Sequence, residues 1–131
     1  MKIAIIFGTL DVFHYGHLHI LERSRELCDR LVVCISSDEL NFSKTGSDPY
    51  YSFEERARIV SALTCVDEVF KEESLDYKAD YTRQFKADVL VMGDDWTGKF
   101  DWVKPLTGCE IHFLPRTPAI STSAIIEILR D

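Results

Sequence analysis

The residues best suited to chemistry lie near the N-terminus, where FHYGHLHIL (13–21) places three histidines within six positions. His14 and His17 are three residues apart with Gly16 between them, after an apolar segment and at the start of a helical pattern. Imidazoles at a helix N-terminus, beside free N–H groups and a partial positive charge, can donate hydrogen bonds to phosphate oxygens. Gly16 lets backbone or ligand come close. This turn therefore predicts a phosphate site.

Other uses of this motif remain open. A His-x-x-His pair can bind a metal, but a zinc site needs three or four ligands, and the sequence has no matching cluster of Cys, His or Glu. Both histidines could also be structural. The sequence lacks G-x-G-x-x-G and G-x-x-x-x-G-K-[ST], so neither a dinucleotide fingerprint nor a P-loop is present. His19 and His112 fit no pattern, and we expect them to have surface or core roles.

Strand and helix patterns alternate along the chain. Five short apolar segments predict buried strands: IAIIF (3–7), LVVCIS (31–36), VDEVF (66–70), DVLVMG (88–93) and EIHFLP (110–115). Between them lie an apolar stripe over 18–28, a capping box at 52–55 followed by an apolar face (Ile59, Val60 and Leu63), and helices over 76–86 and 122–130. This order predicts an α/β fold, a Rossmann-like doubly wound parallel five-stranded sheet, in a single domain over 1–131.

The predicted topology limits where a ligand can bind. Ligands of such sheets lie at the carboxyl ends of the strands, beside helix N-termini. Three segments meet this condition: 8–17, 93–100 and 115–123. The polar segment NFSKTGSDPYY (41–51), with Gly and Pro, is predicted to be a mobile loop.

The composition limits the kinds of molecule that this protein can bind. The 131 residues carry a formal net charge of −7, which should repel nucleic acid and anionic lipid over most of the surface. No apolar run reaches the roughly 20 residues that span a bilayer, so we expect no membrane insertion. Four cysteines without a C-x-x-C pair are typical of buried small side chains in a reducing cytoplasm. We therefore expect a cytoplasmic protein that binds anions only where cations gather locally.

Five segments, of which the first contains the histidine motif, are spread over nearly the whole chain. With His14-Tyr15-Gly16-His17, the runs GTLDVFHYGH, LVVCISSDE, VDEV, VMGDDWTGKFD and LPRTPAISTSAI resemble the cytidylyltransferase family of the nucleotidyltransferase superfamily. The resemblance implies transfer of CMP from CTP to sn-glycerol 3-phosphate, giving CDP-glycerol and pyrophosphate for a teichoic acid or capsule. It also implies Mg²⁺ with the CTP and a homodimer. Alternatives are another polyol phosphate as acceptor, an adenylyltransferase, or a non-catalytic nucleotide-binding module.

The resemblance also implies roles for particular residues. His14, His17, Lys44 and Arg116 are implied as catalytic, with Lys44 and Arg56 on substrate phosphate and Asp11 near a metal or orienting the histidine turn. The implied contacts with CTP are Thr9, Leu10, His14, His17, Asp94, Asp95, Trp96, Arg116, Thr117, Ile120, Ser121 and Thr122.

Four positions depart from the family pattern. Leu10 replaces a phenylalanine, and Gly46 replaces a basic residue two positions after Lys44, which reduces the attraction for an acceptor phosphate. Thr64 and Cys65 replace an Arg-Tyr pair at the family's dimer contact. We still expect a dimer, with altered contact geometry.

Overall fold

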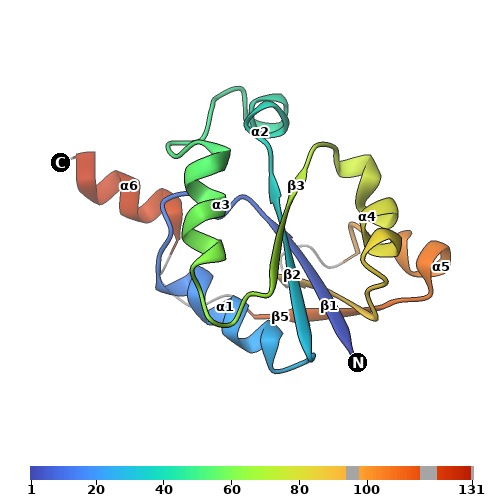
Figure 1. The fold of residues 1–131 in the computed structure, drawn as a ribbon. Helices are drawn as coiled ribbons and strands as arrows, with labels where there is room; N and C mark the ends of the chain where they lie inside the picture. The colour runs from blue at the N-terminus through green and yellow to red at the C-terminus, as the bar shows by residue number, and fades with distance from the viewer. Residues whose placement is uncertain (94–97, 116–120, 131) are drawn as a thin grey trace.

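Five parallel strands form one sheet at the centre of a computed structural model, which describes residues 1–93, 98–115 and 121–130 (Figure 1). The strands are β1 (Ile3–Gly8), β2 (Arg30–Ser36), β3 (Glu68–Glu72), β4 (Val89–Gly93) and β5 (Glu110–Leu114). They lie in the order β3-β2-β1-β4-β5, and Ala4 of β1 is aligned with Leu31 of β2 and Val89 of β4. The predicted Rossmann-like parallel sheet is confirmed.

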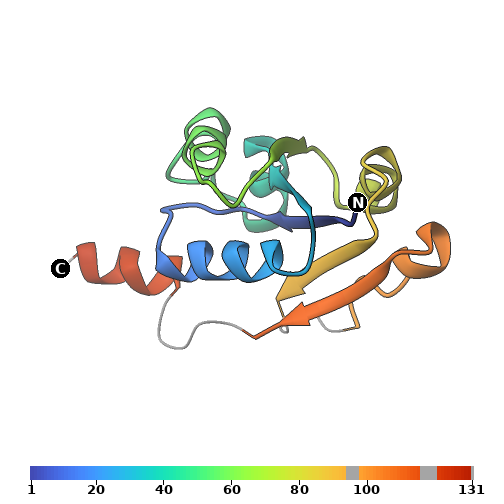
Figure 2. The same cartoon turned by 60° about the horizontal axis from the view of Figure 1, so that its bottom comes forward.

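Helices connect the strands and cover both faces of the sheet (Figure 2). They are α1 (Tyr15–Arg25), α2 (Asp38–Thr45), α3 (Phe53–Ser61), the short 3₁₀ helix η1 (Leu75–Tyr77), α4 (Lys78–Gln84), α5 (Val103–Thr107) and α6 (Thr122–Arg130). Leu21 of α1 and Val60 of α3 pack on one face of the sheet, and Ala79 of α4 and Val103 of α5 pack on the other. No helix within the described residues is long and apolar enough to cross a bilayer.

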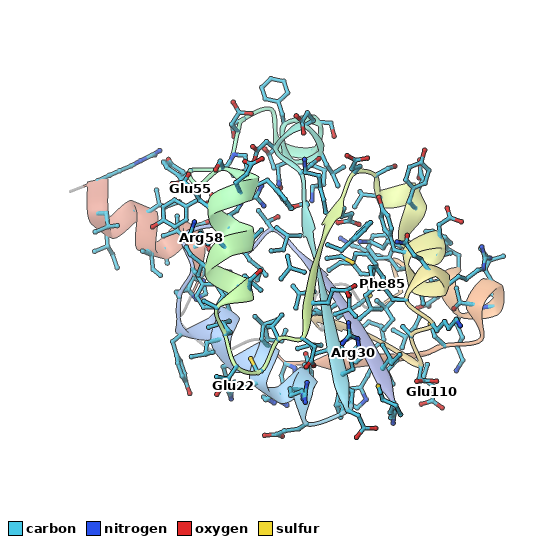
Figure 3. All side chains as sticks on the ribbon, in the orientation of Figure 1. Glu22, Arg30, Glu55, Arg58, Phe85 and Glu110 are labelled. Atoms are coloured by element: carbon cyan, nitrogen blue, oxygen red, sulfur yellow. The ribbon has the colours of Figure 1, made fainter. Side chains whose placement is uncertain are left out.

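Figure 3 shows the side chains on this fold, some in the core and others at the surface. Phe85 packs into the core beneath α4, whereas Glu22 and Arg58 are exposed. The predicted capping box of α3 is confirmed, because Ser52 and Glu55 each bind the other's backbone N–H. Ile59 is 37% exposed, so the prediction that it belongs to the core face was wrong, although Val60 is fully buried.

Two boundaries differ from the sequence prediction and affect the site. Residues 41–45 belong to α2 and not to a loop: Ser37 caps the helix, and Gly46 ends it with a positive φ. Strand β3 lies two residues later than predicted, because the Asp67 backbone and side chain both bind the Leu31 backbone before the strand begins. The later end of β3 brings Glu72 to the carboxyl edge of the sheet.

Helix α6 extends away from the sheet at the C-terminus (Figure 1). It spans Thr122–Arg130, close to the predicted range. The apolar side of this helix carries Ile128 and Leu129, which are 71% and 75% exposed. This apolar side is therefore not buried in the isolated chain.

Candidate active site

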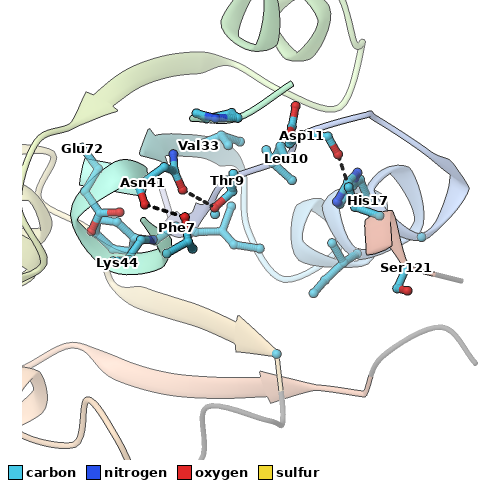
Figure 4. Close-up of a pocket in the computed structure, with 18 of the residues that line it drawn as sticks. Phe7, Thr9, Leu10, Asp11, His17, Val33, Asn41, Lys44, Glu72 and Ser121 are labelled. Atoms are coloured by element: carbon cyan, nitrogen blue, oxygen red, sulfur yellow. Dashed lines mark hydrogen bonds between the residues drawn. The ribbon is translucent and has the colours of Figure 1, made fainter. Parts of the chain in front are cut away.

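A cavity of about 650 Å³ opens at the carboxyl edge of the sheet, where the fold predicts a ligand site (Figure 4). The end of β1 and the start of α1 line one part of it, and α2, the end of β3 and the start of α4 line another. The first turn of α6 lines it as well. In Figure 4, His17 and Ser121 lie toward one end of the cavity, and Lys44 and Glu72 toward the other.

His14 and His17 lie side by side at the start of α1. Their rings stack with centroids 3.8 Å apart. The Nδ1 atom of His14 accepts a hydrogen bond from the Gly16 N–H (3.0 Å), and the Nδ1 atom of His17 accepts one from the His14 N–H (3.2 Å). Because Nδ1 is the acceptor in both rings, the proton of each neutral imidazole is on Nε2. The turn therefore fixes two Nε2–H donors next to each other.

Both imidazoles are held in the neutral form. Burial lowers the pKa of His14. The pKa of His17 is lowered to about 4, mainly by burial and also by the neighbouring His14, while Asp11 partly opposes the shift. At neutral pH this pair therefore supplies hydrogen-bond donors without a full positive charge.

We expect the partly buried His17 to make the protein less stable as the pH falls. Its pKa drops from 6.5 in the unfolded chain to about 4 in the folded protein, so between these values the unfolded chain binds more protons. The contribution of neutral His17 to the free energy of unfolding is therefore fully present above the pKa of the unfolded chain. It is lost as the pH falls toward the pKa of the folded protein. Between about pH 7 and pH 5 this titration should lower the free energy of unfolding by up to about 2 kcal/mol.

The matched comparison for this effect is His17→Asn, whose amide oxygen can accept the same bond from the His14 N–H. Urea unfolding of both proteins at the two pH values isolates the contribution of the imidazole, since other titrating groups are shared. The wild type should lose about 1–2 kcal/mol more than the variant. Equal losses would contradict the placement of a neutral, partly buried imidazole at residue 17.

Asp11 joins two loops beside the histidine turn. Its carboxylate is buried and accepts hydrogen bonds from the backbone N–H groups of Val12 (3.1 Å), Tyr50 (2.7 Å) and Tyr51 (2.9 Å). Its carbonyl oxygen accepts one from the Thr122 hydroxyl at the start of α6 (2.8 Å). Both carboxylate oxygens are already used, so the geometry does not fit the expected approach to a metal. It fits the alternative expectation, that Asp11 orients the turn.

The described residues contain no group of three or more His, Cys, Asp or Glu side chains that could hold a metal ion. The Nδ1 atoms of the histidine pair are also engaged with backbone N–H groups. The described part of the chain thus presents no cluster of side chains for a resident metal centre.

Arg56 lies beneath the site and not in it. The residue is 0% exposed. Its guanidinium donates to the carbonyl oxygens of Tyr51 (3.0 Å), Thr9 (2.9 Å) and Ser36 (2.8 Å), and to the carboxylate of Asp38 (2.7 Å). Four directed bonds leave it unavailable to a substrate phosphate, which corrects the expected phosphate contact. The side chain instead fixes the ends of β1 and β2 at the floor of the cavity.

Asn41 is a site residue that the sequence analysis did not identify. Its amide donates to the Ser36 hydroxyl (2.8 Å) and to the Ser37 carbonyl (2.9 Å), and its oxygen accepts from the Thr9 hydroxyl (3.1 Å; Figure 4). Next to Thr9, Leu10 has a φ of 54°, a left-handed conformation rare for a leucine. These contacts hold the predicted nucleotide-contacting segment at Thr9 and Leu10 in one conformation.

Lys44 and the start of α6 also line the cavity. Lys44 lies in the last turn of α2, and burial lowers the pKa of its ammonium group, with Glu72 partly opposing the shift. Ser121 caps α6 by accepting from the Ala124 N–H (3.1 Å). The structure therefore brings together Thr9, Leu10, Asp11, His14, His17, Lys44, Ser121 and Thr122 around one cavity.

Other predicted site residues are not placed. Asp94, Asp95, Trp96, Arg116, Thr117 and Ile120 lie outside the described residues. Conversely, Glu72 and Lys78 line the cavity although the sequence analysis did not name them. The sequence gives little indication that these two residues belong to a site, because a charged residue at a strand end and a lysine in a polar helix are common on protein surfaces.

Comparison with known proteins shows the family to which the chain belongs. The model of the cytidylyltransferase-like family matches residues 5–128. The chain belongs to this family. It is 46% identical over 127 residues to glycerol-3-phosphate cytidylyltransferase of Bacillus subtilis, covering 97% of this chain and 96% of that protein. It is 42% identical to the enzyme of the same name from Staphylococcus aureus, covering 95% and 92%.

A solved structure shares the fold. The lipopolysaccharide core biosynthesis protein from Thermoplasma volcanium superimposes with a TM-score of 0.73 at 25% identity, covering 89% of this chain and 97% of that one. The family resemblance expected from the sequence motifs is thus confirmed.

Proposed function

We propose that this protein transfers CMP from CTP to sn-glycerol 3-phosphate, releasing pyrophosphate and CDP-glycerol. The observation that carries the proposal is the pair of Nε2–H donors fixed at the carboxyl edge of the sheet, in a chain 46% identical to glycerol-3-phosphate cytidylyltransferase. A phosphate oxygen of the acceptor attacks the α-phosphorus of CTP. The bond from this phosphorus to the bridging oxygen breaks, and pyrophosphate leaves.

The reaction needs no general base. The second pKa of a phosphate monoester is about 6, so at neutral pH the acceptor is already mostly the dianion. Catalysis then consists of aligning two anions and stabilising charge on the α-phosphate and the leaving group. Neutral imidazoles suit this task, because they donate hydrogen bonds to the α-phosphate without holding the product tightly by ionic attraction. Mg²⁺ arrives as part of the CTP substrate, bound to its phosphates.

The test is a panel of acceptors and nucleotides, in which pyrophosphate and the nucleotide product are measured together. We expect CTP with glycerol 3-phosphate to give CDP-glycerol. Turnover with another phosphorylated polyol and none with glycerol 3-phosphate would favour a different acceptor. Turnover with ATP in place of CTP would favour an adenylyltransferase, and CTP binding without product would favour a binding module.

We expect Lys44→Ala to weaken substrate binding about tenfold or more, seen as a higher KM with a smaller change in kcat. The ammonium group lies at the end of α2 on the cavity wall, where it can attract an acceptor phosphate. Lys86→Ala serves as the control, since this exposed lysine does not line the cavity. An unchanged KM would show that Lys44 does not contact a substrate.

Assembly and compartment are part of the same proposal. We expect a cytoplasmic homodimer, in keeping with four free cysteines. Light scattering of the purified protein tests the dimer.

A further inference from the structure

A buried ion pair lies at the opposite end of the cavity from the histidines (Figure 4). Glu72 is the last residue of β3, and Lys78 is the first residue of α4. Their charged groups are 2.7 Å apart, and the two residues are only 2% and 3% exposed. Both nevertheless contribute atoms to the cavity wall. The pair is therefore shielded from bulk water but available to a ligand.

Each member of the pair is held in a defined position. The Lys78 ammonium binds one carboxylate oxygen of Glu72, Oε2, and lies 4.0 Å from the ring centroid of Phe7 and 4.8 Å from that of Phe100. The Glu72 backbone carbonyl accepts a hydrogen bond from the Ser37 N–H, which fixes the end of β3. The other carboxylate oxygen of Glu72, Oε1, has no hydrogen-bond partner among the described residues. A rigid acceptor atom thus faces the cavity.

A contribution to folding stability does not explain why this ion pair is buried. The cost of removing both charges from water can exceed their mutual attraction, and apolar residues of similar size often serve a fold as well. Burial accordingly lowers the pKa of Lys78, and Glu72 opposes that shift. A charged pair placed on the wall of a ligand cavity is better explained by recognition of a polar ligand.

The charges in this half of the cavity specify the ligand's chemistry. Among the described lining residues, Lys78 neutralises Glu72 and Lys44 contributes a further positive charge, while Asp48 also lines the cavity. Phe7 and Phe100 supply apolar surface. A phosphate monoester with a short carbon chain and neutral hydroxyl groups matches all three features, whereas a cationic amino alcohol meets the Lys78 ammonium.

We propose that Glu72, positioned by Lys78, is the residue that recognises the hydroxyl groups of the acceptor and selects a neutral polyol phosphate. This inference rests on the proposed transfer of CMP to such an acceptor. Glu72 accepts hydrogen bonds from the hydroxyls through its unpartnered oxygen. Lys78 is a positioning residue, which also keeps the site neutral and so disfavours acceptors such as ethanolamine phosphate.

The experiment compares acceptors with and without hydroxyls. In wild-type protein, kcat/KM for glycerol 3-phosphate should exceed that for propyl phosphate by about 10²-fold or more, because a missing hydroxyl leaves a buried acceptor unpaired. Glu72→Gln should reduce this ratio about tenfold or more, with the KM for CTP unchanged. The control is Glu73→Gln, the exposed neighbour, which should leave the ratio as it is.

A second variant tests the role of the charge. Lys78→Met should raise the relative use of ethanolamine phosphate about tenfold or more, because it leaves Glu72 as an uncompensated anion. If this variant does not fold, the neutral double variant Glu72→Gln/Lys78→Met decides. It should lose the preference for hydroxyls without gaining ethanolamine phosphate.

The outcomes separate the two proposals. CDP-glycerol formation with an unchanged acceptor ratio in Glu72→Gln would overturn the role of Glu72 and leave the proposed function intact. Absence of CDP-glycerol in the wild type would overturn the proposed function. The same comparison would then use whichever polyol phosphate is turned over and its deoxy analogue, and equal rates for the two would overturn the role of Glu72.

Discussion

Replacing His14 or His17 by asparagine is expected to lower kcat by about 10²- to 10³-fold while the fold is kept. Asparagine carries an amide oxygen near the position of the imidazole Nδ1. It can therefore keep the bond that His14 accepts from the Gly16 N–H, or that His17 accepts from the His14 N–H. What it removes is the Nε2–H donor. Because that donor acts on charge that develops in the transition state, kcat should fall more than KM changes.

The measurement is steady-state kinetics of CDP-glycerol formation for the two variants and for His19→Asn. His19 stacks on Tyr15 and does not line the cavity, so its replacement should leave kcat within about a factor of two of wild type. Asparagine is also among the best helix N-caps, so His14→Asn should keep α1 folded. A variant at residue 14 or 17 with the wild-type kcat would show that this imidazole does not act on the reacting phosphate.

The strands could be predicted because burial on both faces leaves a direct record in the sequence. The run LVVCIS, for example, forms the fully buried centre of β2. The start of α1 could be predicted because a short motif contains all of its chemistry. Helix α2 was missed although Ser37 and Gly46 mark its ends, because its residues are mostly polar and its two apolar residues, Leu40 and Phe42, are not at helical spacing. Lys44, predicted to lie in a mobile loop, is therefore in a helix, and it lines the cavity.

Contacts between distant segments explain the other differences. The sequence identifies Arg56 and Asp11 as charged residues near a phosphate motif, and the chemistry of either would suit a ligand. Their bonds to backbone groups of residues 9, 36, 50 and 51 arise only when three loops meet at the sheet edge. The Glu72–Lys78 pair likewise depends on where β3 ends. Such roles follow from tertiary geometry, which a single sequence does not reveal.

This geometry gives Arg56 the largest expected effect on stability. Arg56→Lys keeps the positive charge but cannot supply the four hydrogen bonds that the guanidinium makes. Buried carbonyl oxygens of Thr9 and Ser36 then lose a donor. We expect the free energy of unfolding to fall by about 3 kcal/mol.

Arg58→Lys is the matched control, because Arg58 lies two residues along the same helix and is exposed. Its unfolding free energy should stay within about 0.5 kcal/mol of wild type in urea titrations. If Arg56→Lys changed stability no more than Arg58→Lys, the guanidinium would not be holding the loops together. The two strand ends that Arg56 fixes carry the segment predicted to contact the nucleotide. For this reason, a folded Arg56→Lys protein should also bind CTP more weakly, which isothermal titration can measure separately from unfolding.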